Sequence, residues 1–141
     1  MGADALESAL RALRSRDRST YELERRLEEQ GFPRHARERA LATLRRTGLI
    51  DDARFARARA VSLAARGSGD ELVRHELRSA GVDVEVVEDA VAALEPESER
   101  ARRIVAARGA GPKTARYLSA RGFSHEVVVS AVATYETDEL R

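Results

Sequence analysis

The strongest constraint on this chain is a pattern that occurs three times: a leucine, a glycine four residues later, and then an apolar residue. The three sets are Leu27, Gly31 and Phe32; Leu77, Gly81 and Val82; and Leu118, Gly122 and Phe123. Further matches follow in the same register, at Ala40, Ala90 and Ala131 and at Leu44, Leu94 and Tyr135. Agreement at so many spaced positions indicates three copies of one supersecondary unit, which buries its apolar face by stacking on its neighbours.

Each copy predicts a helix, a tight turn and a second helix. A glycine just past the last apolar residue accepts the left-handed conformation that ends a helix, and the next apolar residue folds back onto the last turn. Ser19 and Glu22 have the spacing of a capping box, and Asp83 stands where an N-cap is wanted. The stripe of Val87, Ala90 and Val91 has helical spacing and predicts a face turned toward a core.

A further helix is expected before each pair, at about 4–15, 51–65 and 97–107. The chain is 43% hydrophobic and only 4% aromatic, which favours helices with small aliphatic cores. We therefore predict an all-α fold, an elongated array of three tandem three-helix repeats. The predicted boundaries are 1–47, 48–95 and 96–137, followed by a short tail at 138–141.

Charge is distributed unevenly although the formal net charge is only +1. Residues 79–99 carry seven carboxylates and no base, whereas residues 100–125 carry seven Arg or Lys and no carboxylate. Basic residues recur at corresponding positions of the repeats, where a regular array would align them along one edge to meet an acidic protein surface or phosphates. An ordinary solvated face with ion pairs is the alternative. The candidate partner-binding residues are Arg16, Arg18, Arg25, Arg26, Arg66, Arg74, Arg108, Lys113, Arg116 and Arg121.

No constellation of residues predicts catalysis, a metal site or a cofactor. The acids at Asp51 and Asp52 suit the start of a helix better than acid–base chemistry. The three histidines have no clustered second ligand. The glycines at 67–69 and 109–111 lack the flanking strand and Lys-Ser/Thr of a phosphate loop, and we expect them to form hinges at repeat boundaries.

The cellular compartment is predicted from two further features. The chain contains no cysteine, so disulfides and thiolate metal sites are excluded. Its first residues are amphipathic and include no apolar run long enough for a signal peptide or a membrane span. We therefore expect a cytoplasmic protein without membrane contact.

Three segments carry a resemblance to a known family. They are the segment RSRDRSTYEL, the segment GLIDDARFA at Gly48 to Ala56, and the repeat RGSGDELVRHELRSAGV. Together they resemble the RecX family of bacterial recombination regulators, and the resemblance extends from about Leu6 to Val132. Its most specific part is the first third of the chain.

The resemblance implies a non-enzymatic protein that binds the RecA recombinase and its filament on DNA and lowers its ATPase and strand-exchange activities. It further implies a part in DNA repair, recombination and the SOS response. We expect the protein to be a monomer. The alternative is a helical module that binds nucleic acid directly. Against the alternative, the second helix of the pair, where base reading is expected, is acidic or apolar in two of the three repeats.

Overall fold

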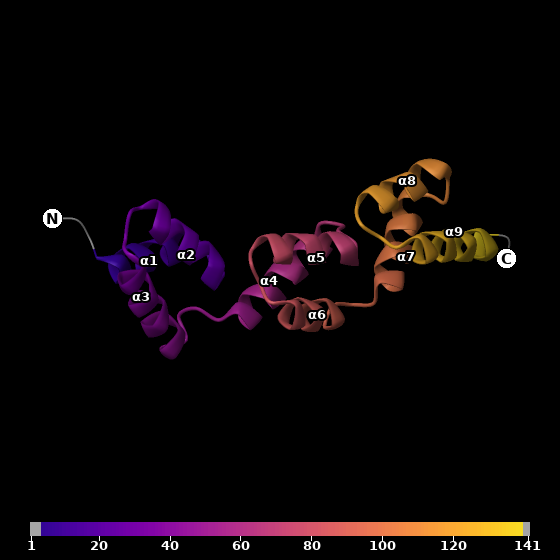
Figure 1. Ribbon diagram of the computed structural model, residues 1–141. Helices are drawn as coiled ribbons and strands as arrows, with labels where there is room; N and C mark the ends of the chain where they lie inside the picture. The colour runs from indigo at the N-terminus through magenta and orange to yellow at the C-terminus, as the bar shows by residue number, and fades with distance from the viewer. Residues whose placement is uncertain (1–3, 140–141) are drawn as a thin grey trace.

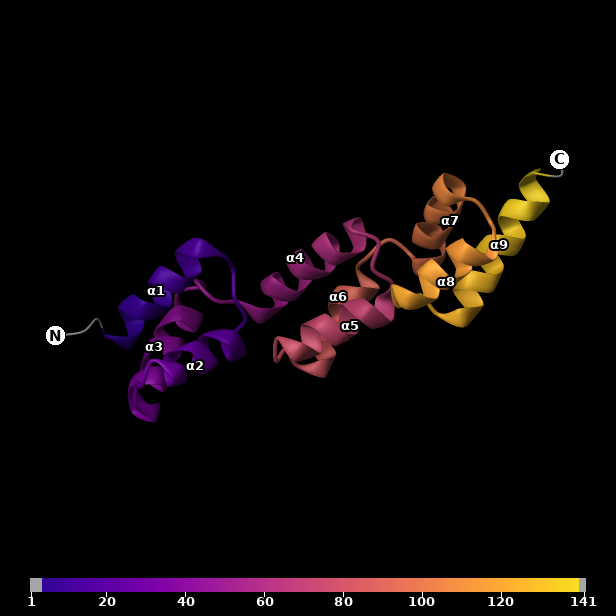
Figure 2. The ribbon, with the colours of Figure 1, turned by 90° about the horizontal axis from the view of Figure 1, so that it is seen from above.

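The computed structural model describes residues 4–139, which form helices and no strands. The first three helices are α1 (Ala5–Ser15), α2 (Thr20–Glu29) and α3 (Arg34–Arg46); the next three are α4 (Asp52–Ala65), α5 (Asp70–Ser79) and α6 (Val84–Ala92). The last three are α7 (Glu97–Arg108), α8 (Pro112–Ala120) and α9 (His125–Glu139). Figure 1 and Figure 2 show these groups following one another in a row, with the two ends of the chain at opposite ends of the molecule. The predicted fold class is confirmed.

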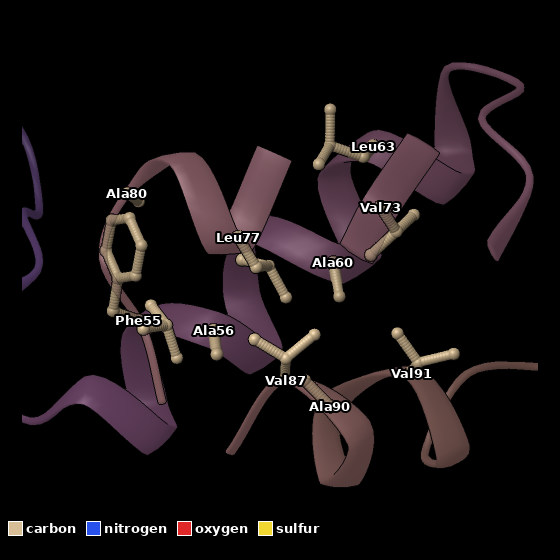
Figure 3. Close-up of a cluster of buried hydrophobic side chains, with 11 residues drawn as sticks. Phe55, Ala56, Ala60, Leu63, Val73, Leu77, Ala80, Val87, Ala90 and Val91 are labelled. Atoms are coloured by element: carbon tan, nitrogen blue, oxygen red, sulfur yellow. The ribbon is translucent and has the colours of Figure 1, made fainter. Parts of the chain in front are cut away.

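Each group of three helices has a separate apolar core. Leu23, Leu27 and Leu44 lie at the centre of the first core, which α1 lines with alanines. Phe55 and Leu77 belong to the second core, where residues of α4, α5 and α6 converge (Figure 3). Leu118 and Phe123 belong to the third. We call the three groups repeats 1, 2 and 3; the exact boundaries given above stay a prediction, and residues 140–141 of the tail lie outside the described part.

The glycine turns have the same hydrogen bonding in all three repeats. Gly31, Gly81 and Gly122 have φ of +89°, +76° and +89°, the left-handed region. The amide of the following apolar residue donates to the carbonyl of the anchoring leucine, as in Phe32 to Leu27 at 3.2 Å and Phe123 to Leu118 at 3.1 Å. These are the bonds of a Schellman helix end. The turn is therefore specified by the local sequence, as predicted.

The helix starts agree with the sequence analysis in part. Ser19 and Glu22 form both bonds of a capping box, and the Asp4 side chain accepts from the amide of Glu7 at 2.8 Å. Asp83 occupies the N-cap position of α6, but its side chain caps no amide there. The segment that follows it, although rich in valine, is helical.

Repeats 1 and 2 meet at a joint made by the start of α2 and the turn after α5. The Ser19 hydroxyl donates to the carbonyl of Ala80 at 2.6 Å, and the Tyr21 ring lies directly against Gly81. Asp52, at the start of α4, accepts from the amide of Thr20 at 2.8 Å and from its hydroxyl at 3.0 Å. The neighbouring Asp51 caps α4 through the amide of Arg54 at 3.1 Å. The two acids are thus structural, one as a cap and one as a link between repeats.

Repeats 2 and 3 meet through corresponding elements, the start of α5 and the turn after α8. The amide of Gly69 donates to the carbonyl of Arg121 at 2.7 Å, and the amide of Glu71 donates to the carbonyl of Gly122 at 3.2 Å. Glu97, at the start of α7, accepts from the amide of Asp70 at 2.8 Å, as Asp52 does from Thr20 in the first joint. The same construction therefore joins both pairs of neighbours.

The glycine segments were wrongly expected to be hinges at repeat boundaries. Gly67–Gly69 connects α4 to α5 and Gly109–Gly111 connects α7 to α8, so both lie inside a repeat. A Cβ on Gly69 would overlap the backbone of Phe123 in the next repeat. Gly69 is thus required for close packing between repeats, which is a tertiary constraint that no local pattern announces.

Candidate partner-binding surface

In repeat 1 the structure gathers three candidate cations near the end of α1. Arg18 is half-buried and donates to the Ala12 carbonyl at 3.2 Å and to the Ser15 hydroxyl at 3.2 Å. Burial lowers the pKa of Arg18, and the charges of Arg16 and Arg26 lower it further. Three guanidinium groups therefore share one neighbourhood, with Glu22 beside Arg16 at 3.4 Å.

A second group of candidates lies at the joint between repeats 2 and 3, around Tyr117. The guanidinium of Arg108 stacks on the Tyr117 ring with 3.6 Å between its carbon and the ring centroid, and that of Arg121 lies 5.9 Å from the same centroid. Arg121 also donates to the carbonyls of Arg66 at 2.7 Å and Gly67 at 3.4 Å. We name Arg66, Arg108, Tyr117 and Arg121 the joint cluster.

The remaining candidates differ in their side-chain contacts and in their exposure. Arg74 is committed to carboxylates of its own repeat, Glu88 at 2.9 Å and Glu71 at 2.7 Å, and these hydrogen bonds raise its pKa. The Tyr21 hydroxyl and then Glu29 raise the pKa of the exposed Arg25. Lys113 and Arg116 are exposed on α8. The ten candidates thus include two clusters, one internal ion pair and several separate surface cations; whether any of them binds a partner stays a prediction.

Arg100 is the residue that sequence reasoning missed. Its side chain is only 7% exposed and lies between repeats 2 and 3. It donates to the carbonyls of Ser68 at 2.8 Å and Glu95 at 2.9 Å, and it pairs with Asp70. One feature of the sequence could have indicated its role. Arg100 is the fourth residue of α7, and the fourth residue of α4 is the core residue Phe55, so a charged side chain stands at a position that is apolar in repeat 2.

Burial of this ion pair perturbs its carboxylate. Desolvation raises the pKa of Asp70, and the nearby charge of Glu97 raises it further, against the lowering effect of Arg100. Glu97 in turn accepts from the amide of Ser124 at 2.9 Å, which ties the start of α9 to the same place. The second joint is therefore a charged network as well as a backbone contact.

Metal sites and membrane-spanning helices are absent from the described residues. Among residues 4–137, whose side chains the structure describes, no group of three or more His, Asp or Glu is placed to hold a metal ion. Within residues 4–139, no helix combines the length and hydropathy needed to cross a membrane.

Comparison with protein families supplies two matches in consecutive order. Residues 5–44 match the model described as RecX, first three-helix domain, and residues 51–91 match RecX, second three-helix domain. The matched stretches correspond to repeats 1 and 2.

Curated relatives carry the name regulatory protein RecX. The chain is 43% identical to that of Mycolicibacterium smegmatis over 95 residues, which are 66% of this chain and 50% of the relative. It is 31% identical to that of Serratia proteamaculans over 90% of this chain and 95% of the relative. The match thus spans about half the length of the mycobacterial relative and nearly all of the second.

Solved structures agree in fold. The crystal structure of RecX from Lactobacillus salivarius superposes with a TM-score of 0.82 at 17% identity, covering 94% of this chain and 95% of that one. A second crystal structure of regulatory protein RecX superposes with a TM-score of 0.72 at 24% identity, covering 87% of this chain and 67% of that one. With consecutive family matches, a full-length relative at 31% identity and the same arrangement of helices, the chain belongs to the RecX family of regulatory proteins.

Proposed function

We propose that this protein binds the RecA recombinase and its filament on DNA, and inhibits ATP hydrolysis and strand exchange without doing chemistry of its own. Membership of the RecX family supports the regulatory role. The observation that carries the choice of surface is the joint cluster, where Arg108 and Arg121 of repeat 3 lie around Tyr117 and Arg121 donates to the backbone of repeat 2 at Arg66. No cofactor is needed for such a function, and we expect it to be exercised in the cytoplasm by a monomer.

The elongated shape supports a mechanism of many weak contacts. A cationic cluster lies in repeat 1 and another at the second joint, so one molecule offers two separated points of attachment (Figure 1). Linked contacts raise overall affinity because the second binding event is intramolecular. Arginine forks suit either carboxylates or phosphates, which a nucleoprotein filament presents together. Inhibition would then be steric and electrostatic.

Charge reversal tests Arg108 of the joint cluster together with Lys113 and Arg116, the two exposed cations of α8. The triple variant Arg108→Glu, Lys113→Glu and Arg116→Glu is expected to raise the concentration needed for half-inhibition of RecA ATPase at least tenfold, while far-ultraviolet circular dichroism stays unchanged. The matched control reverses three exposed cations of α3, Arg39, Arg45 and Arg46. It makes the same change in net charge. Undiminished inhibition by the triple variant, or equal loss in the triple variant and its control, contradicts this surface.

Direct binding of nucleic acid is the second candidate, and the joint cluster favours it because arginines beside an aromatic ring are frequent in single-strand binding. Titrating salt against binding to DNA alone separates the two functions. Each phosphate contact contributes a slope of roughly −0.7 in a plot of log affinity against log salt for a single strand. A steep slope that the Arg108→Glu change reduces supports DNA contact, and no measurable binding without RecA supports the protein partner.

A further inference from the structure

Ion pairs join the second and third helices of repeats 1 and 2. In repeat 1, Arg37 of α3 pairs with Glu24 of α2 at 2.8 Å. In repeat 2, Arg74 of α5 pairs with Glu88 of α6 at 2.9 Å. Each ion pair bridges two helices of its repeat.

Repeat 3 has no charges at the corresponding positions. Glu24 and Arg74 lie three residues before the anchoring leucines, and the residue three before Leu118 is Ala115. Arg37 lies ten residues after Leu27 and Glu88 eleven after Leu77. The residues ten and eleven after Leu118 are Val128 and Val129. The bridge between α8 and α9 is therefore replaced by apolar side chains.

A groove lies at these positions of repeat 3. It has a volume of about 540 Å³ and lies between α8 and α9. Its apolar lining consists of Ala115, Val128, Val129, Val132 and Ala133. Val129 is 52% exposed, although Val128 beside it is buried in the core of repeat 3. Helix α9 is thus apolar on the side that packs inward and on part of the side that faces outward, which is typical of a helix with a second contact to make.

The charged residues at the rim of the groove indicate which charges a partner should carry. The α8 side bears Arg116, with Lys113 one turn earlier, and residues 100–125 include no carboxylate. The opposite side bears Glu136 on α9. A partner that places carboxylates toward α8 is therefore attracted, whereas one with bases on that side is repelled.

We propose that the α8–α9 groove is a docking site for an amphipathic helix of another protein, which inserts an aliphatic stripe into the groove and presents carboxylates to Arg116 and Lys113. Stripes with residues at i, i+3 or i+4 and i+7 are the usual ligands of such grooves. The proposal goes beyond the RecA function above and does not require that the partner be RecA. It concerns an apolar contact in repeat 3, whereas the joint cluster lies between repeats.

The structure supplies its own variant for the test. Ala115→Arg combined with Val129→Glu installs in repeat 3 the residues that bridge the helices in repeat 2. The variant is expected to fold because repeat 2 does so with the same pair. Val61→Glu is the matched control, since Val61 is 61% exposed on α4 and lies outside the groove.

Two synthetic helical peptides serve as probes, with the same leucine stripe and with either glutamates or lysines beside it. Fluorescence polarisation is expected to show that the glutamate peptide binds the wild-type protein and Val61→Glu alike. Its affinity for the Ala115→Arg, Val129→Glu variant is expected to be at least tenfold weaker, and the lysine peptide is expected to bind the wild type at least tenfold more weakly.

Three results overturn the proposal: no binding of the glutamate peptide, equal binding of the two peptides, or unchanged binding to the double variant. Sedimentation checks a different occupant, because a wild-type dimer that the double variant abolishes would show that a second copy fills the groove. The RecA proposal can fail independently, since the double variant retains Arg108, Lys113 and Arg116. Circular dichroism and thermal unfolding of each variant show that it is folded.

Discussion

At the scale of single residues, the buried cation Arg100 makes contacts with several separate segments of the chain. Arg100 contacts two backbone carbonyls and Asp70, and its guanidinium carbon lies 5.9 Å from the centroid of the Phe123 ring. Its contacts therefore come from the loop before α7, from repeat 2 and from the turn after α8. A hydrophobic residue here would fill space but leave those oxygen atoms without a donor.

Replacing Arg100 by Met is expected to lower the free energy of unfolding by about 3 kcal/mol, because it breaks a buried pair from one side. Chemical denaturation measures the change. Arg103→Met is the control, since the Arg103 side chain is 69% exposed and its pair with Glu95 lies at the surface. That change is expected to cost less than about 0.5 kcal/mol. Equal losses in the two variants would contradict a special role for Arg100.

The loss in Arg100→Met is expected to depend on pH. The pKa of Asp70 is already raised by burial and by Glu97, and removing the positive charge of Arg100 raises it further. An acid whose pKa is higher in the folded state than in the unfolded state stabilises the fold when protonated, and that contribution is lost as pH rises through the folded-state pKa. The gap between wild type and variant should therefore be smaller at pH 4.5 than at pH 7.5. A gap that widens in acid would exclude Asp70 as its source.

At the scale of helices and turns, the sequence is informative wherever the cause of the structure is local. Leucine–glycine spacing predicts the three turns, and the capping pairs at Asp4 and Ser19 predict two helix starts. Contacts between distant segments are different. Neither the packing of Gly69 on Phe123 nor the commitment of Arg74 to Glu88 has a signature near those residues.

The candidate site is predictable to the same extent. Repeat register places cations at the ends of α1, α4 and α7, where Arg16, Arg66 and Arg108 lie. It does not predict that two arginines lie around the Tyr117 ring, because that arrangement depends on how the end of α7 packs against α8. The α8–α9 groove is not predicted for a simpler reason. An apolar residue with helical spacing is interpreted as part of the core unless it is compared with the residues at the same position of the other repeats.

A turn that touches the next repeat should tolerate substitution less well than a free turn. Gly31 and Gly81 both have positive φ, but a Cβ on Gly31 has nothing within 4 Å, whereas one on Gly81 would overlap the Tyr21 ring. Gly31→Ala is expected to cost about 1 kcal/mol for the left-handed conformation alone. Gly81→Ala should cost about 1–3 kcal/mol more, through overpacking. Thermal or chemical unfolding measures both, and equal costs would show that Tyr21 yields freely.

At the scale of the whole molecule, the two joints differ in strength. The first is held by Ser19, Thr20 and Tyr21 against Ala80, Gly81 and Asp52. The second has the corresponding contacts and in addition the buried Arg100 and the hydrogen bonds from Arg121 to the backbone of repeat 2. Repeats 2 and 3 therefore form the more rigid pair, and bending of the array is expected mainly between repeats 1 and 2.

Spin labels can measure this difference, since the chain has no cysteine of its own. Cysteines introduced in pairs at the exposed positions Arg11 and Ala58, or Ala58 and Ala106, report on the first and second joints respectively. Double electron–electron resonance is expected to give a broader distance distribution for the first pair. Adding Arg100→Met should broaden only the second. A broader distribution for the second pair in the wild type would contradict the ranking of the joints.

The acid that links each repeat to the one before it shows how the two joints differ from the outer faces of the array. Asp52 and Glu97 each accept from the first amide of the preceding second helix, at Thr20 and Asp70. Repeat 3 has Pro112 at that position, which has no N–H to donate, and repeat 1 has Ala5 where the acid would stand. The hydrogen bond from a helix-start amide to an acid, which links each repeat to the next, therefore has no donor at Pro112 and no acceptor side chain at Ala5, and these two residues distinguish the outer faces of repeats 3 and 1 from the two joints.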